Sequence, residues 1–356
     1  YLMHGYRLMF TTDYLPGRIA QLNGENWLYF SGTSYLGMVQ NNDFQNLICE
    51  NIQQYGANFG GSRLSNLRFK IYEEAEQYLA NWTGAEAALT VSSGSLAGQL
   101  AVKVLQNWGK FYFAPGVHPA LFEEGDYSES SFEQWAEYIL NEAQQGKPMV
   151  LFSNTLDPLR AKSFDFNWLF QIPKETPLTL VLDDSHGLGV TGINGAGAFS
   201  TLQTPENVEL IAVASLGKAL AIPGGVILGS KNLIQNIWQS PYFGGASPVI
   251  PAYLAAFLDA GGLYHDARQR LFSNIQAFHD AVKTPGLFEN FTDYPVFYTK
   301  INNLAEYLQT HKILISSFPY PTPQDKRITR VVLNAAHTNA DIDHLVNFIK
   351  TFTNES

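Results

Sequence analysis

The chain has 356 residues, a length that suits two domains or one large domain with a smaller one attached. Only 15% of its residues are charged, less than the roughly 25% typical of soluble domains. A large core or a sizeable subunit interface would explain this. The net charge of −10 argues against nucleic-acid binding, which normally needs a basic surface.

Cysteine usage and hydropathy exclude further classes. The single cysteine, Cys49, excludes an internal disulfide framework and a multi-cysteine site, and we expect no metal ion. No uninterrupted apolar run of about 18 residues is present, so no transmembrane helix is expected. The first ten residues lack the apolar core of a signal peptide. These patterns predict a cytoplasmic protein with no membrane partner.

The first part of the chain predicts an arm followed by a strand and helices. Residues 1–40 are short apolar pieces interrupted by proline and glycine, as expected of an arm. Residues 71–82 have helical periodicity. Residues 87–91 predict a short strand, and the small residues 92–95 lead into a helix over residues 96–108.

Three apolar runs in the middle of the chain predict buried strands. They cover residues 178–182, 210–214 and 226–229. Near-continuous apolar runs are typical of parallel strands that are covered on both faces. Their alternation with helices predicts an α/β fold, with a mostly parallel sheet and helices on both of its faces.

The texture changes after about residue 245, where we expect a smaller C-terminal α+β domain. Its predicted elements are a helical stretch over residues 251–281, strands over 295–301, 313–318 and 328–333, and a closing amphipathic helix over 339–352. The chain is therefore divided into an arm (residues 1–40), a large α/β domain (41–244) and a small domain (245–356).

Polar clusters follow three of the predicted strands. Ligands of open α/β sheets bind beyond the carboxyl ends of the strands, so one cofactor could contact all three clusters. The clusters are Ser93-Gly94-Ser95, residues 183–186, and residues 215–218. The first suits a phosphate, because small residues let backbone N–H groups and a helix N-terminus approach it. A serine that merely caps the helix is the alternative.

The second and third clusters carry a carboxylate and an amine. Asp183, at a strand end, could keep a pyridine nitrogen protonated, or could simply end the strand in a polar turn. Lys218 lies among small and apolar residues, where desolvation would lower its pKa and favour a nucleophilic amine. A surface lysine is the alternative. Ser215 offers a further phosphate contact.

These motifs together resemble the α-oxoamine synthase family, whose members are fold type I enzymes that use pyridoxal 5′-phosphate (PLP). The resemblance covers nearly the whole chain, in order. The matching segments are residues 27–38 (WLYFSGTSYLGM), Gly60-Gly61-Ser62-Arg63, residues 88–102, residues 183–192 (Asp-x-x-His-Gly-x-Gly-x-x-Gly), residues 215–220 (Ser-Leu-Gly-Lys-Ala-Leu) with Gly224-Gly225, and residues 330–345 (RVVLNAAHTNADIDHL).

The resemblance implies roles for the residues that face the cofactor. Lys218 would form the Schiff base with PLP and later move the Cα proton. Asp183 would pair with the pyridinium nitrogen, and His186 would lie near the phenolic oxygen. His118 would stack on the ring, although a plain loop histidine is the alternative. The phosphate would be held by Ser93, Gly94, Ser95 and Ser215.

On the substrate side, Arg330 matches the arginine that binds the amino-acid carboxylate. A bidentate guanidinium suits that task. Arg18 is a further candidate for a substrate contact, and Thr33 stands where the family has a substrate-side asparagine. Each arginine could instead be a charge at a solvated surface.

The chain departs from the family at several positions. The family's Ser-Thr-Ser-x-Pro, which reaches the phosphate from the partner subunit, is here Gly244-Gly245-Ala246-Ser247-Pro248. Asn154 follows Ser153 where the family has a glutamate, and Tyr72 replaces a histidine. The region from 110 to 180 is shorter. These departures support PLP chemistry more strongly than any one substrate.

The resemblance implies an acyltransferase that condenses an amino acid with an acyl thioester of CoA or of a carrier protein. The motifs most resemble the 8-amino-7-oxononanoate synthase group of biotin biosynthesis. The glycine C-acetyltransferase (2-amino-3-ketobutyrate CoA ligase) group shares nearly the same motifs. An aminotransferase on the same fold would also fit them, as would a non-catalytic partner subunit. Since fold type I enzymes place their active sites at a homodimer interface, a homodimer is expected.

Overall fold

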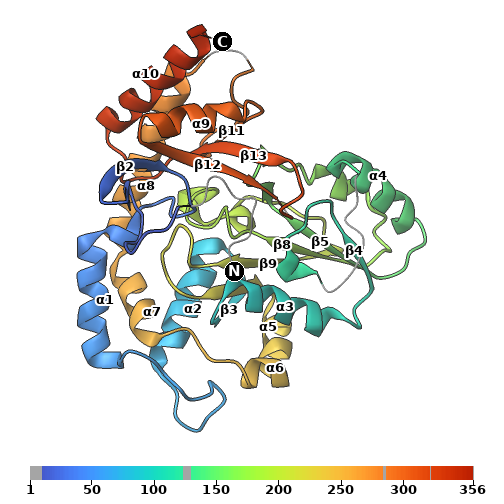
Figure 1. Ribbon diagram of the computed structural model, residues 1–356. Helices are drawn as coiled ribbons and strands as arrows, with labels where there is room; N and C mark the ends of the chain where they lie inside the picture. The colour runs from blue at the N-terminus through green and yellow to red at the C-terminus, as the bar shows by residue number, and fades with distance from the viewer. Residues whose placement is uncertain (1–9, 123–129, 284–285, 321, 356) are drawn as a thin grey trace.

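The computed structural model describes residues 10–122, 130–283, 286–320 and 322–355. Two β-sheets lie one above the other in Figure 1, with helices around them. The first nine residues of the predicted arm lie outside the described part of the chain. Among the described helices, none has both the length and the apolarity needed to cross a bilayer.

The larger sheet has six strands. Their order is β3 (Ala87–Val91), β10 (Gly225–Gly229), β9 (Val208–Ser215), β8 (Leu178–Asp183), β5 (Met149–Asn154) and β4 (Lys110–Phe113). Strands β9, β8, β5 and β4 run parallel to one another. All six residues of β8 are buried, which is why its sequence is mostly apolar, with Thr179 and the terminal Asp183 as the exceptions.

The prediction that residues 226–229 form a strand of the parallel type was wrong in its direction. Strand β10 runs antiparallel to both of its neighbours. The reason is the connection from β9, which spans only residues 216–224. A parallel return needs a crossover of about a dozen residues or more, whereas an antiparallel return does not.

Successive residues of the sheet face opposite layers of helices. Val181 of β8 and Ile211 of β9 pack in the cluster of α3 (Gly94–Leu105) and α5 (Lys231–Trp238). Leu180 and Leu182 pack with α4 (Phe132–Ala143). The face of β9 and β10 that contains Ala212 packs in the cluster of α1 (Asn42–Tyr55), α2 (Lys70–Thr83) and α7 (Pro251–Asp259).

The smaller sheet combines both ends of the chain. Its order is β1 (Ile19–Leu22), β2 (Glu25–Phe30), β12 (Ile313–Pro319), β13 (Arg327–Val332) and β11 (Val296–Thr299). Strands β1 and β2 form a hairpin across Asn23 and Gly24, which both have positive φ, and β2 pairs in parallel with β12. The predicted arm therefore packs with the C-terminal part.

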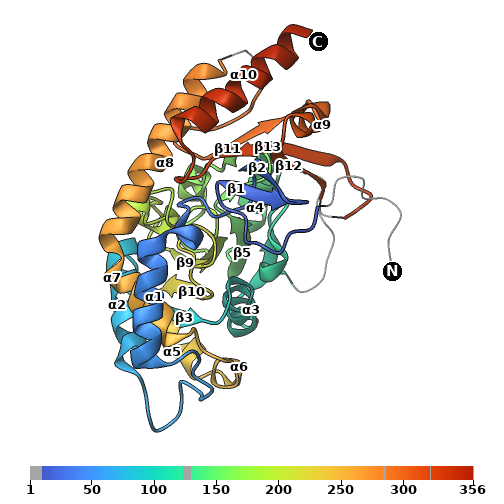
Figure 2. The ribbon, with the colours of Figure 1, turned by 60° about the vertical axis from the view of Figure 1, so that its left-hand side comes forward.

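Helices complete the C-terminal part. Helix α8 (Gly261–Ala281) runs along one side of the molecule, from α7 toward α10 (Asn339–Glu355), as Figure 2 shows. Helix α7 packs on α1 and α2. The predicted division of the chain after residue 244 stays a prediction. The remaining elements are η1 (Met38–Gln40), η2 (Pro119–Leu121), β6 (Leu156–Asp157), β7 (Lys162–Ser163), η3 (Asn167–Gln171), η4 (Ile193–Gly195), η5 (Ala198–Ser200), α6 (Pro241–Gly244) and α9 (Asn303–Thr310).

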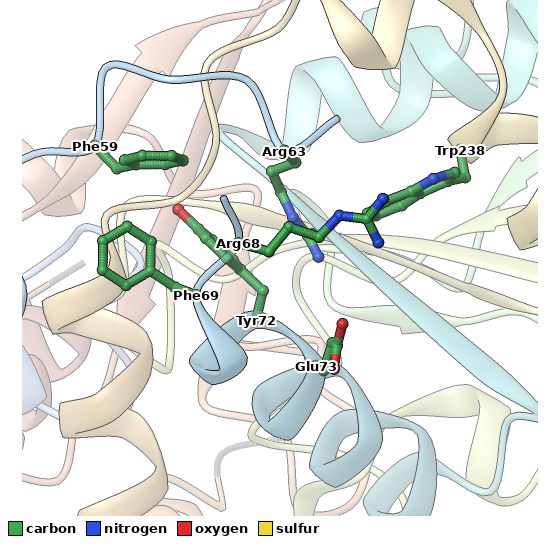
Figure 3. A pocket seen from close by; sticks show the side chains of 7 residues that line it. All are labelled: Phe59, Arg63, Arg68, Phe69, Tyr72, Glu73 and Trp238. Carbon is green, nitrogen blue, oxygen red and sulfur yellow. The ribbon is translucent and has the colours of Figure 1, made fainter. Parts of the chain in front are cut away.

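A buried ion pair ties the loop after α1 to the large sheet. Arg63 donates to both carboxylate oxygens of Glu76 on α2, and its guanidinium lies 4.3 Å from the ring centroid of Tyr72 (Figure 3). Glu76 also accepts from the backbone N–H and the hydroxyl of Thr90 in β3, at 2.7 and 2.8 Å. The carboxylate therefore joins three segments of the chain.

Glu76→Gln should strongly destabilise the fold. Removing one partner of a buried pair leaves the other charge without compensation, and the expected loss is about 3 kcal/mol of unfolding free energy. Glu73→Gln is the matched control, because Glu73 is exposed one turn earlier on α2, and it should change stability by less than about 0.5 kcal/mol. Urea unfolding measures both. Equal losses in the two variants would contradict the role given to Glu76.

Candidate active site

The first and third predicted clusters meet at the carboxyl edge of the large sheet. A Cβ placed on Gly94 would lie 2.8 Å from both Cα and Cβ of Ser215, closer than real Cβ atoms approach. The first turn of α3 therefore lies directly against the end of β9. Only glycine leaves room for this approach, so the structure brings together two segments that were expected to hold the same phosphate.

The hydroxyl groups of these segments have different tasks. Ser93 caps α3, since its oxygen accepts from the backbone N–H of Leu96 at 3.1 Å. Ser95 is exposed in the first turn of the same helix. The Ser215 hydroxyl accepts from the Gly217 N–H at 3.2 Å. Ser93 is thus a helix cap, whereas the side chain of Ser95 is exposed.

Asp183 and His118 lie next to each other at the same edge. One Asp183 oxygen accepts from the backbone N–H of Ser185 at 2.9 Å, and the other lies 3.6 Å from Nδ1 of His118. That Nδ1 accepts from the Ala120 N–H at 3.1 Å, which places the proton of a neutral His118 ring on Nε2. The contact to Asp183 is therefore proximity rather than a hydrogen bond.

Asn154, in the Ser153-Asn154 pair that corresponds to the family's Glu-Ser segment, holds the loop that carries His118. Its side-chain oxygen accepts from the His118 backbone N–H at 3.0 Å, and its amide donates to the Gly116 carbonyl at 2.8 Å. Asn154 ends β5 directly beside Asp183 in β8. The sequence showed the substitution but not this function.

Lys218 lies in the connection between β9 and β10. Burial lowers the pKa of its amine, the Asp183 carboxylate raises it, and the Arg330 guanidinium lowers it further. The net shift is downward, toward the neutral amine that a nucleophile needs. A lysine that snorkels to the surface does not fit this buried position.

His186 and Arg330 complete the cluster. Burial, followed by the charges of Lys218 and Arg330, holds the pKa of His186 well below its ordinary value, so its ring is neutral. Arg330, on β13, is 6% exposed. It donates through Nη1 to the Pro158 carbonyl, while its Nε has no hydrogen-bond partner among the residues that the structure describes.

The two remaining substrate-side candidates differ in their surroundings. Arg18 gives both of its hydrogen bonds, at 2.6 and 3.2 Å, to the carboxylate of Asp341. This ion pair fixes the β1 end of the arm on the start of α10, and we leave Arg18 out of the site. Thr33 is half-buried, and its carbonyl accepts from the backbone N–H of Tyr35 at 2.9 Å.

Comparison with known proteins places this geometry in a family. Residues 131–349 match the family "Aminotransferase class I and II", which is more than half of the chain. The chain belongs to this family. The resemblance to α-oxoamine synthases and the prediction of a PLP-dependent transferase of fold type I are thereby confirmed.

Several curated relatives of this chain are named 8-amino-7-oxononanoate synthase. The 8-amino-7-oxononanoate synthase of Petrotoga mobilis is 27% identical over 94% of this chain and 90% of its own length. That of Dechloromonas aromatica is 26% identical over 94% of this chain and 92% of its own length.

Solved structures share the fold at lower identity. Serine palmitoyltransferase of Sphingomonas wittichii is 18% identical, with a TM-score of 0.79 over 96% of this chain and 91% of that chain. The 8-amino-7-oxononanoate synthase of Francisella tularensis is 21% identical, with a TM-score of 0.69 over 92% of this chain and 98% of that chain.

The residues of this class I and II family member fit PLP. The lowered pKa of the Lys218 amine suits reaction with the aldehyde of PLP. The Asp183 carboxylate, whose charge acts on Lys218, suits the pyridinium nitrogen. The close approach at Gly94 brings the N-terminus of α3 beside Ser215, and a helix N-terminus suits a phosphate. The unpartnered Nε of Arg330 suits the carboxylate of an amino acid.

Asp184 is a residue of this cluster that sequence reasoning missed. It is buried, and it accepts from the Thr155 hydroxyl at 2.7 Å and from the Ala198 N–H at 2.8 Å. Burial raises its pKa to about 7, although both hydrogen bonds lower it. Asp184 thus fixes the loop after β8, which carries His186. The one feature of the sequence that could have pointed to Asp184 is its position directly after the apolar run 178–182 and Asp183.

Asp184 should make stability fall as pH rises. Its folded-state pKa lies above the unfolded value of 3.8, so the folded chain binds the proton more tightly, and this stability is lost between about pH 4 and 7. Asp184→Asn cannot titrate. Between pH 5 and 7, the cofactor-free wild type should lose roughly 2 to 3 kcal/mol relative to this variant, measured by urea unfolding. Parallel pH profiles would contradict the assignment.

Proposed function

We propose that the chain is an acyltransferase of the α-oxoamine synthase type, which joins an amino acid to the acyl group of a thioester. The observation that carries this is the cluster of buried Asp183 and Arg330 with half-buried Lys218 and His186 at the end of the large sheet. Within the type we propose 8-amino-7-oxononanoate synthase, which makes a biotin precursor from alanine and a pimeloyl thioester. The full-length relatives of that name support this.

The chain's own residues divide the work. When bound, PLP supplies an aldehyde for an amine and a ring that accepts electrons. The Lys218 amine takes and returns the proton at the α-carbon of the amino acid. Asp183 holds a proton on the ring nitrogen, because a carboxylate beside it favours the charged form. His118 packs on the ring, and Arg330 orients the amino-acid carboxylate.

A substrate screen tests the proposal. The PLP-loaded enzyme should release CoA with alanine and a long acyl-CoA, faster than with glycine or serine and faster than with acetyl-CoA. Lys218→Ala should lower turnover by at least about 100-fold, since it removes a general acid–base group. The release of CoA can be followed with a thiol reagent.

Each competing function predicts a different result of the same screen. Amine transfer to a keto acid without CoA release would identify an aminotransferase. Preference for glycine and acetyl-CoA would identify a glycine C-acetyltransferase. A colourless protein with neither activity would identify a non-catalytic subunit.

We infer in addition that the enzyme is a homodimer. Two segments in contact expose apolar side chains: Leu67 is 69% exposed and Tyr242 is 58% exposed. The Ser62 hydroxyl donates to the Gly244 carbonyl at 2.7 Å and joins these segments. Exposed apolar side chains on two joined segments, here called the Leu67–Tyr242 patch, favour a subunit interface. One of the two segments leads into residues 244–248, which replace the family's phosphate-reaching element. A cytoplasmic location stays a prediction.

Sedimentation equilibrium measures the state of assembly. The wild type should show twice the chain mass of 39.6 kDa, and Leu67→Asp should shift it toward the single chain. Phe170→Asp is the control, because Phe170 is 55% exposed on η3, outside the patch. A fully active wild-type monomer would contradict the homodimer.

A further inference from the structure

A chain of two phenols and one imidazole connects three distant segments. The Tyr35 hydroxyl lies 2.8 Å from Nδ1 of His186 and 3.5 Å from the Tyr294 hydroxyl. Tyr35 precedes η1, His186 follows β8, and Tyr294 precedes β11. Both tyrosines are buried, at 1% and 0% exposure. No role has so far been given to either of them.

The protonation states of the three groups follow from their burial. Burial raises the pKa of Tyr35 and of Tyr294, so both phenols keep their protons and can donate. Burial and nearby positive charges keep His186 neutral. A neutral imidazole has one N–H and one bare nitrogen, and the hydrogen bond made by one nitrogen fixes the state of the other.

The two distances favour the arrangement in which Nδ1 is the bare nitrogen. The Tyr35 proton can go toward Tyr294 or toward His186, and the shorter contact is to His186. Its length of 2.8 Å is typical of an O–H donor. Tyr294 then donates to Tyr35 over the longer contact. In this arrangement both phenol protons have an acceptor, which a buried polar network requires.

We propose that Tyr35 is a positioning residue that fixes the tautomer of His186. Its hydroxyl donates to Nδ1, which leaves the imidazole proton on Nε2 and keeps that nitrogen available as a hydrogen-bond donor. Tyr294 supports it from the other side. The proposal rests on the proposed function in one respect, since the acceptor for Nε2 would be the phenolic oxygen of PLP.

The surroundings show why a second residue is needed for this task. The charged and titratable groups that reach His186 are Lys218, Arg330 and His118, and each of them disfavours a charged ring. These charges set the protonation of the ring, whereas the choice between its two neutral tautomers needs a hydrogen-bond partner at one ring nitrogen, and among the described residues Tyr35 is in that position. A directional O–H donor at Nδ1 makes that selection.

The first experiment reads the tautomer without any catalysis. Nitrogen NMR on the full-length, cofactor-free chain, labelled with ¹⁵N-histidine, should show a bare Nδ1 and a protonated Nε2 for His186 between pH 6 and 9. His186→Gln identifies the signals. Tyr35→Phe should give a mixture of tautomers, and Tyr294→Phe, which also removes one buried hydroxyl, should keep the wild-type pattern. A protonated Nδ1 in the wild type would overturn the proposal even if Tyr35→Phe failed to fold.

The second experiment reads the effect on the PLP-loaded enzyme. Loss of a donor to the phenolic oxygen makes that oxygen more basic. Tyr35→Phe should therefore raise the apparent pKa of the cofactor's visible absorption band by about one unit, and Tyr294→Phe by less than about 0.3. Equal values in Tyr35→Phe and the wild type would show that Tyr35 does not act through His186. A chain that binds no PLP but shows the expected tautomer would reject the proposed function and leave the tautomer assignment standing.

Discussion

The geometry of the site depends on one close approach between backbones. The chain leaves β3, crosses the start of β10 and begins α3 against the end of β9. A Cβ on Gly225 would collide with the Ser93 carbonyl oxygen, and a Cβ on Gly94 would lie 2.8 Å from Ser215. Two glycines therefore permit a helix start to reach across one strand to the next. Without this crossing, the N–H groups of α3 and the loop that holds Lys218 would not share a ligand.

The second feature on which the site depends is the set of charged and titratable groups around Asp183. Arg330 and Asp183 are buried, Lys218 and His186 are half-buried, and the surrounding positive groups lower the pKa of both Lys218 and His186. Such a cluster is stabilised by an anionic ligand, because a buried guanidinium without compensation is costly. A phosphate and a carboxylate, the charges of PLP and an amino acid, supply that compensation.

The sequence predicted the helices and strands around this site better than the direction and pairing of the strands. The runs over 178–182 and 210–214 became β8 (Leu178–Asp183) and β9 (Val208–Ser215), because strands buried on both faces must be continuously apolar. The direction of β10 was wrong, since apolarity does not report direction. The β1–β2 hairpin was missed, although Asn23-Gly24 is a strong hairpin signal.

Side-chain partners far apart in the sequence were beyond prediction. Tyr35 and His186 are 151 residues apart, and Arg18 and Asp341 are 323 apart. No periodicity links such positions, because they meet only when two sheets are assembled. The family resemblance gave roles to Lys218, Asp183 and His186, but it could not show which side chain holds each of them in place.

Asn154 shows how a departure from the family can preserve geometry while changing charge. Its amide makes two hydrogen bonds to the loop of His118, so the loop stays in place. Asn154 lies beside Asp183 in the sheet register. A carboxylate there would lie next to the one that faces Lys218, and like charges at close range disfavour each other's ionised form. The neutral amide of Asn154 holds the loop without adding a charge beside Asp183, which already has the buried Asp184 carboxyl as its neighbour.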